Sequence, residues 1–359
     1  MSVTVRHRFT ASSFSRVCGA LLLTAPCLIA MTTGGTAQTA VAEFYKGKSV
    51  YILVGTAAGG GFDAYGRMVA RHLGKHIPGN PTIIPQNLDG GGGWRATQRV
   101  AMTAPPDGTT IGAILPTTLL DPLIGDPRKK LERFDLAFLG SASKNLQACF
   151  VRTDAPVQSA QDLFEKELIV GAGNATSTTF GFSTVLKNVL DAKLKITAGY
   201  TGNAQIYVAM DRGEVQGMCG TSIIGVISMR ANWFQDKFAR AILQESATGH
   251  PDLNALGVPR ALSFAKTDEQ RQMLEVYYSQ QEFGRPYIVN VKTPPDRLAA
   301  LQKAFMDTMR DPELLRESEK LQLDIDPITG PEVAALVAKA YASSPEAVAK
   351  LREAMGYGH

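Results

Sequence analysis

The chain has 359 residues, of which 37 are lysine or arginine and 33 are aspartate or glutamate, for a formal net charge of +4. This near balance excludes the strongly basic footprint that is typical of nucleic-acid-binding proteins. A chain of this length exceeds what one hydrophobic core comfortably organises, so we expect two domains.

The first segment has the pattern of a secretory signal peptide. Three arginines without an acidic residue precede the apolar run Val17–Met31, and Ala40–Ala42 has the A-x-A spacing of a cleavage site. The apolar run is short for a membrane span, and a retained anchor is the alternative. Cleavage after Ala42 would leave 34 basic and 33 acidic residues, a charge of +1. The sequence therefore predicts a signal peptide over residues 1–42 and a periplasmic location.

The most informative motif is a strand, a glycine-rich turn and a helix in direct succession. Val50–Val54 is apolar, Gly55–Gly61 consists of small residues, and helical spacing begins at Phe62. Glycine lets backbone N–H groups approach a ligand closely. The first turn of a helix leaves its N–H groups unpaired and carries partial positive charge. The motif predicts a site for an anion such as a carboxylate or a phosphate.

Short apolar runs and helical patterns then alternate along the chain. Further strands are expected at Thr82–Pro85, Thr110–Leu115, Leu168–Val170, Val215–Met218 and Pro286–Val291. This rhythm predicts an α/β fold with largely parallel sheets. We assign residues 43–147 and 285–359 to a discontinuous first domain and residues 148–284 to a second domain. No flexible spacer separates them, so we expect them to be joined by crossing strands.

Four polar loops of small residues follow predicted strands. They are Gly55–Asp63, Pro116–Thr118, Gly171–Thr179 and Gly199–Asn203. Ligands of open α/β sheets bind at the carboxyl ends of the strands, where these loops lie. The loops therefore predict a cleft lined from both domains. Such turns also occur without any ligand. Because none of the four loops contains lysine or arginine, we expect neutral donors to do most of the anion binding.

Two nucleotide-binding motifs are weaker explanations of the first loop. Gly59, Gly61 and Ala64 fit a dinucleotide fingerprint, but the next strand ends at Pro85–Asn87 without the acidic residue that this motif requires. The Gly-Lys-Ser sequence at Gly47–Ser49 precedes its strand, whereas a phosphate loop follows one.

Several single residues have two interpretations. Asp63 either caps the helix that starts there or receives a ligand's amino group. Tyr200 either reaches the cleft or packs beneath its loop. His72 and His76 are four residues apart and share a helix face, but no further residue completes a metal site, so exposed and structurally idle histidines are favoured.

Two cysteines, Cys149 and Cys219, lie beyond the predicted signal peptide, each at the end of an apolar, strand-like run. In an oxidising periplasm they form either a disulfide or two buried thiols. Sequence spacing leaves this choice open, because it does not fix their geometry.

Together these motifs resemble the extracytoplasmic solute receptors of tripartite tricarboxylate transporters, the Bordetella uptake gene (Bug) family. The matching segments run from about Tyr45 to Leu323 and read VGTAAGGGFDAYGR, NLDGGGGWRA, PPDGTTIG, GAGNATSTT and GYTGN. The resemblance implies a Venus-flytrap fold of periplasmic binding protein type II, with two α/β domains. It also implies a carboxylate ligand, held largely by backbone groups and waters, and delivery to membrane transporter subunits.

The chain departs from the family pattern at several places. Gly55 and Thr56 replace a usual proline and phenylalanine, and Thr179 replaces a usual histidine. Ala261–Arg285 does not follow the pattern, and Pro345–His359 is predicted to be an added C-terminal helix. These departures concern the ligand's identity more than the fold.

Loops and resemblance together predict the ligand-binding residues. They are Ala57, Ala58, Gly59, Gly60, Asp63, Thr117, Thr118, Gly173, Asn174, Ala175, Thr176, Ser177, Thr178, Tyr200, Gly202 and Thr221. We expect a monomeric receptor for a small organic acid, either a di- or tricarboxylate or an aromatic carboxylate, with no cofactor, no metal and no enzyme activity. The alternatives are a secreted α/β enzyme that acts on a small carboxylate, and a ligand sensor without a transport role.

Overall fold

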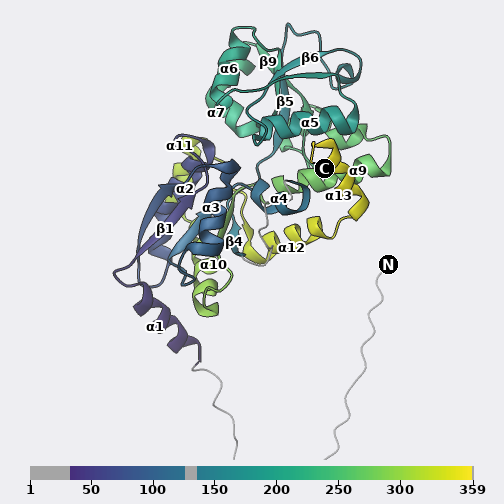
Figure 1. Cartoon of the computed structure of the whole chain (residues 1–359). Helices are drawn as coiled ribbons and strands as arrows, with labels where there is room; N and C mark the ends of the chain where they lie inside the picture. Colours follow the sequence, from purple (N-terminus) through teal and green to yellow (C-terminus); the bar gives the residue numbers. More distant parts are fainter. Residues whose placement is uncertain (1–32, 126–135, 358–359) are drawn as a thin grey trace, which may run out of the picture.

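The computed structural model describes residues 33–125 and 136–357, which form two α/β units around separate β-sheets (Figure 1). The first sheet has the strand order β11-β4-β10-β3-β1-β2 and the second has the order β7-β6-β8-β5-β9. The first sheet contains β1 (Ser49–Val54), β2 (Thr82–Asn87), β3 (Thr110–Ala113), β4 (Leu136–Ser141), β10 (Pro286–Asn290) and β11 (Ile328–Thr329). The second contains β5 (Gln147–Arg152), β6 (Leu168–Gly171), β7 (Leu194–Thr197), β8 (Gly217–Ser222) and β9 (Ala239–Gln244).

Helices cover both sheets. In the first part of the chain they are α1 (Thr33–Tyr45), α2 (Gly61–Leu73), α3 (Trp94–Gln98) and α4 (Thr117–Ile124). The middle part has α5 (Thr178–Leu190), α6 (Asn203–Asp211), α7 (Ile223–Gln235), α8 (Pro251–Ala255) and α9 (Asp268–Tyr278). The last part has α10 (Pro295–Met309), α11 (Pro312–Leu321), α12 (Gly330–Tyr341) and α13 (Pro345–Ala354).

Each sheet combines parallel strands with antiparallel ones. Strand β1 runs parallel to β2 and β3, and β6 runs parallel to β7 and β8. Strand β10 is antiparallel to β3 and β4, and β5 is antiparallel to β8 and β9. The expected parallel strands are therefore present. Strand β10 in the first sheet and β5 in the second run in the opposite direction, because each follows a crossing between the units.

Two chain segments cross between the units. One joins β4 to β5, and the other leads from the short 3₁₀ helix η6 (Ser279–Gln281) to β10. They run side by side: the N–H of Asn145 donates to the carbonyl of Gln281 at 3.0 Å, and the N–H of Ala142 donates to the carbonyl of Arg285 at 3.1 Å. Paired crossings of this kind hold two units together while permitting a hinge motion.

The C-terminal helices return to the second unit. Helix α12 packs on β4 and α4 of the first unit, whereas α13 packs on α9 and α5 of the second (Figure 1). The side-chain amide of Asn188 in α5 donates to the carbonyl of Ala354 at 2.6 Å, and Lys350 forms an ion pair with Glu269 of α9 at 2.7 Å. The predicted C-terminal helix therefore exists, and it lies against the second unit.

Helix α1 runs through the predicted cleavage position. Val41 and Tyr45 are buried in the core of the first unit, and the Tyr45 hydroxyl donates to the carbonyl of Gly108 at 3.2 Å. Most of the predicted signal peptide lies outside the described residues. Within the described ranges, no helix is long and apolar enough to cross a bilayer.

Cys149 of β5 and Cys219 of β8 form a disulfide, and both residues are completely buried. The bond links two neighbouring strands of the second sheet across 70 residues of sequence. Of the two arrangements that the sequence leaves open, the structure has the disulfide.

Candidate functional site

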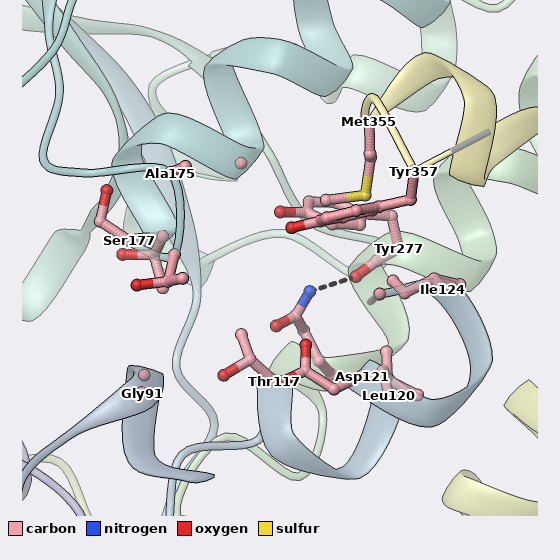
Figure 2. Close-up of a pocket in the computed structure, with 16 residues that line it drawn as sticks. Gly91, Thr117, Leu120, Asp121, Ile124, Ala175, Ser177, Tyr277, Met355 and Tyr357 are labelled. Carbon is pink, nitrogen blue, oxygen red and sulfur yellow. Dashed lines mark hydrogen bonds between the residues drawn. The ribbon is translucent and has the colours of Figure 1, made fainter. Parts of the chain in front are cut away.

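Loops from both units meet in one cleft at the carboxyl ends of the parallel strands. A pocket lies between the units, with α4 on one side and the turn before α5 on the other (Figure 2). Its lining includes the predicted residues Thr117, Ala175, Thr176, Ser177 and Thr178. Gly91 and Gly92 of the NLDGGGGWRA segment also line it, although neither was predicted to bind the ligand. Tyr277, Met355 and Tyr357 also line it, so the C-terminal segment contributes to this pocket.

A second pocket adjoins the first, because both are lined by Thr117, Thr178 and Gln280. Residues in or directly beside the crossing segments contribute side-chain amides to this pocket; they are Asn145, Gln147 and Gln281. Phe62, in the first turn of α2, also lines it. The start of α2 and the crossing segments therefore border the same space.

The start of α2 leaves backbone donors unpaired. Gly60 is the N-cap residue, but no side chain accepts a hydrogen bond there. The first helical hydrogen bond runs from the Ala64 N–H to the Gly60 carbonyl at 2.9 Å. Among the described residues, the N–H groups of Gly61 and Phe62 therefore have no acceptor, as expected for the first turn of a helix. Ala57, Ala58, Gly59 and Gly60 form the exposed loop before this turn.

Asp63 does not cap α2 in the predicted way. Its carboxylate accepts from the Gly59 N–H at 2.9 Å, Arg67 Nε at 2.9 Å and Asn87 Nδ2 at 2.8 Å. Burial raises the pKa of this carboxyl, but the hydrogen bonds from Arg67, Gly59 and Asn87 outweigh burial and keep the pKa below its usual value. Asp63 thus holds the glycine loop against α2 and β2 from a buried position.

The loop before α5 satisfies much of its own hydrogen bonding. Ser177 is the N-cap residue of α5, and its Oγ accepts from the Phe180 N–H at 3.2 Å. Asn174 Oδ1 accepts from the N–H and the hydroxyl of Thr176 at 3.1 and 2.8 Å. The Gly173 N–H donates to Thr179 Oγ1 at 3.0 Å. This loop is therefore already ordered by its own side chains.

The remaining predicted residues line neither of these two pockets. Thr118 is buried and accepts from the Thr97 hydroxyl at 3.1 Å, and Thr221 is buried with its hydroxyl 3.2 Å from that of Tyr207. The ring of Tyr200 lies beside Gly171 and packs against the core of the second unit, as its structural interpretation predicts. Gly202 is the N-cap residue of α6.

Two buried charged residues near the crossing segments were not predicted. Arg285 directly precedes β10 and is 6% exposed, and Glu245 directly follows β9 and is completely buried. Burial raises the pKa of Glu245 to about 8, although the Gly220 N–H donates to its carboxyl group. The position of Arg285 immediately before the predicted strand Pro286–Val291 is the one sequence signal for it. Which residues surround its side chain depends on contacts with distant parts of the chain.

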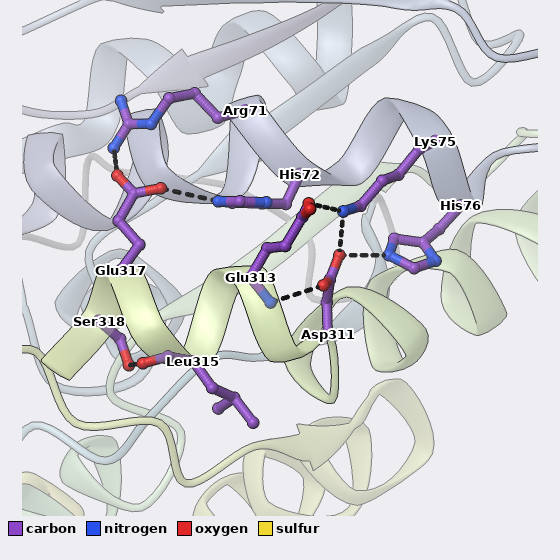
Figure 3. Close-up of polar contacts among 9 residues, drawn as sticks. All are labelled: Arg71, His72, Lys75, His76, Asp311, Glu313, Leu315, Glu317 and Ser318. Carbon is purple, nitrogen blue, oxygen red and sulfur yellow. Dashed lines mark hydrogen bonds and ion pairs between the residues drawn. The ribbon is translucent and has the colours of Figure 1, made fainter.

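His72 and His76 are not idle, contrary to the prediction. His72 Nε2 lies 2.7 Å from Glu317, which connects α2 to α11, and His76 Nε2, in the 3₁₀ turn after α2, lies 3.0 Å from Asp311, the N-cap residue of α11 (Figure 3). His72, Asp311 and Glu313 bring possible metal-ligating atoms within 4.8 Å of one another. However, the Lys75 ammonium lies between the two acids, 2.6 Å from Asp311 and hydrogen-bonded to Glu313. The cluster is therefore an ion-pair network at the end of α2 away from the glycine loop.

Comparison with known proteins establishes the fold. No family model and no curated protein matches the sequence. A TctC solute-binding protein from Polaromonas, solved without ligand, superposes with a TM-score of 0.65 at 18% identity, covering 86% of this chain and 99% of that chain. MatC from Rhodopseudomonas palustris with bound malate has a TM-score of 0.61 at 18% identity, with coverage of 86% and 99%. The periplasmic binding protein BugD has a TM-score of 0.63 at 20% identity, with coverage of 86% and 98%.

These similarities confirm the predicted Venus-flytrap fold of periplasmic binding protein type II, with two α/β units and paired crossing segments. Small-molecule sites occur preferentially at interfaces between domains, and here loops from both units meet at such an interface.

Proposed function

We propose that this chain is a periplasmic solute-binding receptor that captures a small organic carboxylate between its two units and delivers it to a tripartite tricarboxylate-type transporter. The observation that carries the proposal is the start of α2, where unpaired N–H groups border the interdomain space. A helix N-terminus favours an anion because its free N–H groups and its dipole both attract negative charge.

The structural neighbours support the carboxylate class. MatC was solved with malate, and another Rhodopseudomonas palustris protein, with a TM-score of 0.62 at 16% identity over 85% of this chain and 97% of that chain, was solved with adipate. Both ligands carry a carboxylate at each end. The cleft of this chain offers N–H donors at α2 and hydroxyl groups at Thr117, Thr176 and Thr178, which suit two acceptor ends.

Binding and closure are coupled in this proposal. The ligand first contacts the start of α2, and the loop before α5 then covers it as the units rotate about the crossing segments. Each charge-assisted hydrogen bond contributes about 1.5–3 kcal/mol net, so a few such bonds suffice for micromolar affinity. The closed form presents one combined surface to the membrane transporter.

A thermal-shift screen of residues 43–359 tests the proposal. The panel should contain malate, adipate, citrate, benzoate, amino acids, sugars and phosphate. A ligand that binds only the folded state raises stability by about 2.7 kcal/mol at one hundred times its dissociation constant. We expect stabilisation by one carboxylate class, with no conversion of the compound by NMR. Stabilisation by sugars or phosphate alone would refute the carboxylate assignment, and conversion of the carboxylate would favour the enzyme alternative.

The location and the partner need separate measurements. Expression of the full chain in a Gram-negative host should place it in the periplasmic fraction, and its N-terminal residue should be Glu43. Deletion of the transporter genes should abolish uptake of the ligand found in the screen. Unchanged uptake, together with a ligand-dependent change in gene expression, would favour the sensor alternative.

A further inference from the structure

Arg285 occupies a fixed position where the second crossing segment enters the first sheet. Its N–H donates to Ser141 Oγ at 3.0 Å, and its carbonyl accepts from the Ala142 N–H at 3.1 Å. These bonds tie the backbone of Arg285 to the end of β4. The side chain therefore extends from a well-supported point at the junction of the two units.

The guanidinium group is buried between aromatic rings. Its central carbon lies 4.1 Å from the ring centroid of Tyr65 and 4.8 Å from that of Phe62, both in α2. Cation–π contacts of this kind attract a positive charge but do not accept its N–H groups. They hold the group in place and leave most of its hydrogen bonding unmet.

The polar partners of Arg285 are too few for a buried cation. Nη2 donates to Asn145 Oδ1 at 3.3 Å, whereas Nε and Nη1 are buried without any acceptor. No described residue forms an ion pair with this guanidinium, and burial lowers its pKa. Because an unpaired buried charge is costly, proteins normally pair it with an opposite charge. A small anion bound between the units would supply the acceptors that Nε and Nη1 lack.

The same guanidinium faces the start of α2. A Cβ atom placed on Gly61 would lie 3.7 Å from Nη2 and 3.8 Å from Nη1 of Arg285. Gly61, whose N–H is unpaired, thus lies next to the guanidinium group and its unpaired Nη1. Phe62 and Asn145 also line the pocket at the crossing segments, so this corner belongs to the proposed ligand cleft.

We propose that Arg285 and the N-terminus of α2 together bind one carboxylate group of the ligand at the crossing segments. This inference rests on the proposed function and fixes the orientation of the ligand: the end at Arg285 must be anionic. No lysine or arginine lines the first pocket, where the hydroxyl groups of Thr117 and Thr178 could meet the other end. In this proposal the end at Arg285 departs from the expectation that neutral donors do most of the anion binding, because the cation comes from outside the four loops.

The inference predicts strong selection by charge. A site built around a buried cation rejects a neutral analogue, because the cation stays unpaired when that analogue binds. Conversion of one carboxylate of the ligand to an amide should therefore weaken binding by about 100-fold when that end faces Arg285. A site of neutral donors alone would discriminate far less.

The test compares Arg285→Met and Arg285→Lys with Arg310→Met, an exposed arginine at the end of α10 that serves as the matched control. For the carboxylate identified in the screen, we expect a loss of affinity of at least about 100-fold in Arg285→Met, about tenfold in Arg285→Lys and none in the control. The ligand-free melting temperature of Arg285→Met should stay equal or rise, because the variant removes an unpaired buried charge.

The outcomes separate this inference from the proposed function. Unchanged affinity with a lower ligand-free melting temperature in Arg285→Met would show that Arg285 only braces α2, and would leave the receptor function standing. Absence of carboxylate binding by the unmodified chain would refute the function itself. If Arg285→Met does not fold, the Nε–H signal of Arg285 in the unmodified protein decides: it should shift on carboxylate binding, and an unchanged signal would overturn the inference.

Discussion

The two helices that begin at the cleft, α2 and α5, differ in how their first turns are satisfied. Both have 13 residues and both follow a parallel strand. Ser177 caps α5 with its own hydroxyl, whereas Gly60 at the start of α2 supplies no side chain. The side chain of Asp63 instead holds the glycine loop, and Arg285 brings a cation to the open N–H groups. We infer that the first unit captures the charge and that the second unit closes over it.

The largest effect should come from filling the open end of α2. Gly61→Asp places a carboxylate beside the guanidinium of Arg285, where an added Cβ makes ordinary contacts and the backbone needs no unusual φ. We expect the affinity for the ligand to fall at least about 100-fold, because the new side chain occupies the anion site. Gly61→Asn, the neutral control, should lose less than tenfold. Calorimetric titration of both variants measures the difference, and equal losses would contradict a charge-based site.

The next effect concerns the buried acid of the second unit. The folded pKa of Glu245, about 8, exceeds its ordinary value of 4.5 because of burial. Between about pH 4.5 and 8 the folded state holds a proton that the unfolded state releases, so the free energy of unfolding falls as the pH rises, by a few kcal/mol at most. Glu245→Gln should flatten this dependence. Denaturation curves at pH 5 and pH 8.5 measure it, and an unchanged slope in the variant would contradict a raised pKa.

A smaller effect should follow from removing the cap of α5. Ser177→Ala leaves the Phe180 N–H without its acceptor, at a cost of about 1 kcal/mol in the free energy of unfolding. Affinity should change only a few-fold, because this loop is ordered mainly by its own contacts. Urea denaturation and ligand titration measure the two quantities. An affinity loss as large as that of Gly61→Asp would remove the contrast between the units.

The smallest effect is expected at the ion-pair network between α2 and α11. Zinc at tenfold excess over protein should not change the melting temperature, because the Lys75 ammonium already lies between Asp311 and Glu313. Lys75→Gln removes that ammonium, and its response to zinc is the matched measurement. A clear zinc-dependent stabilisation of the unmodified chain would show that the cluster binds metal despite the lysine.

Local patterns predicted much of the fold. The apolar runs at Val50–Val54 and Leu168–Val170 lie in strands, and the predicted strand Thr110–Leu115 overlaps β3, which ends at Ala113. The small-residue loop from Ala175 to Thr178 lies in the cleft because parallel strands end at one edge. Strands β4, β9 and β11 were not predicted. The antiparallel direction of β10 was also not predicted, because it depends on how the chain crosses between the units.

The charged part of the candidate site was beyond prediction because it depends on contacts between distant residues. Arg285 meets Phe62 and Tyr65 only after the second crossing segment has folded back to the first sheet. The Asp63 carboxylate accepts hydrogen bonds from Gly59 and Asn87 and does not form the α2 cap that its position at the helix start predicts. Sequence spacing reports which residues share an element, and it does not report which elements meet.

The most direct test of the account is a crystal structure of the unmodified protein with the carboxylate identified in the screen. We predict one ligand between the units, with a carboxylate oxygen on the N–H groups of Gly61 and Phe62 and within hydrogen-bonding distance of Arg285. The loop from Ala175 to Thr178 should cover its other end. A ligand bound outside this cleft, or with its carboxylate turned away from α2, would contradict the account.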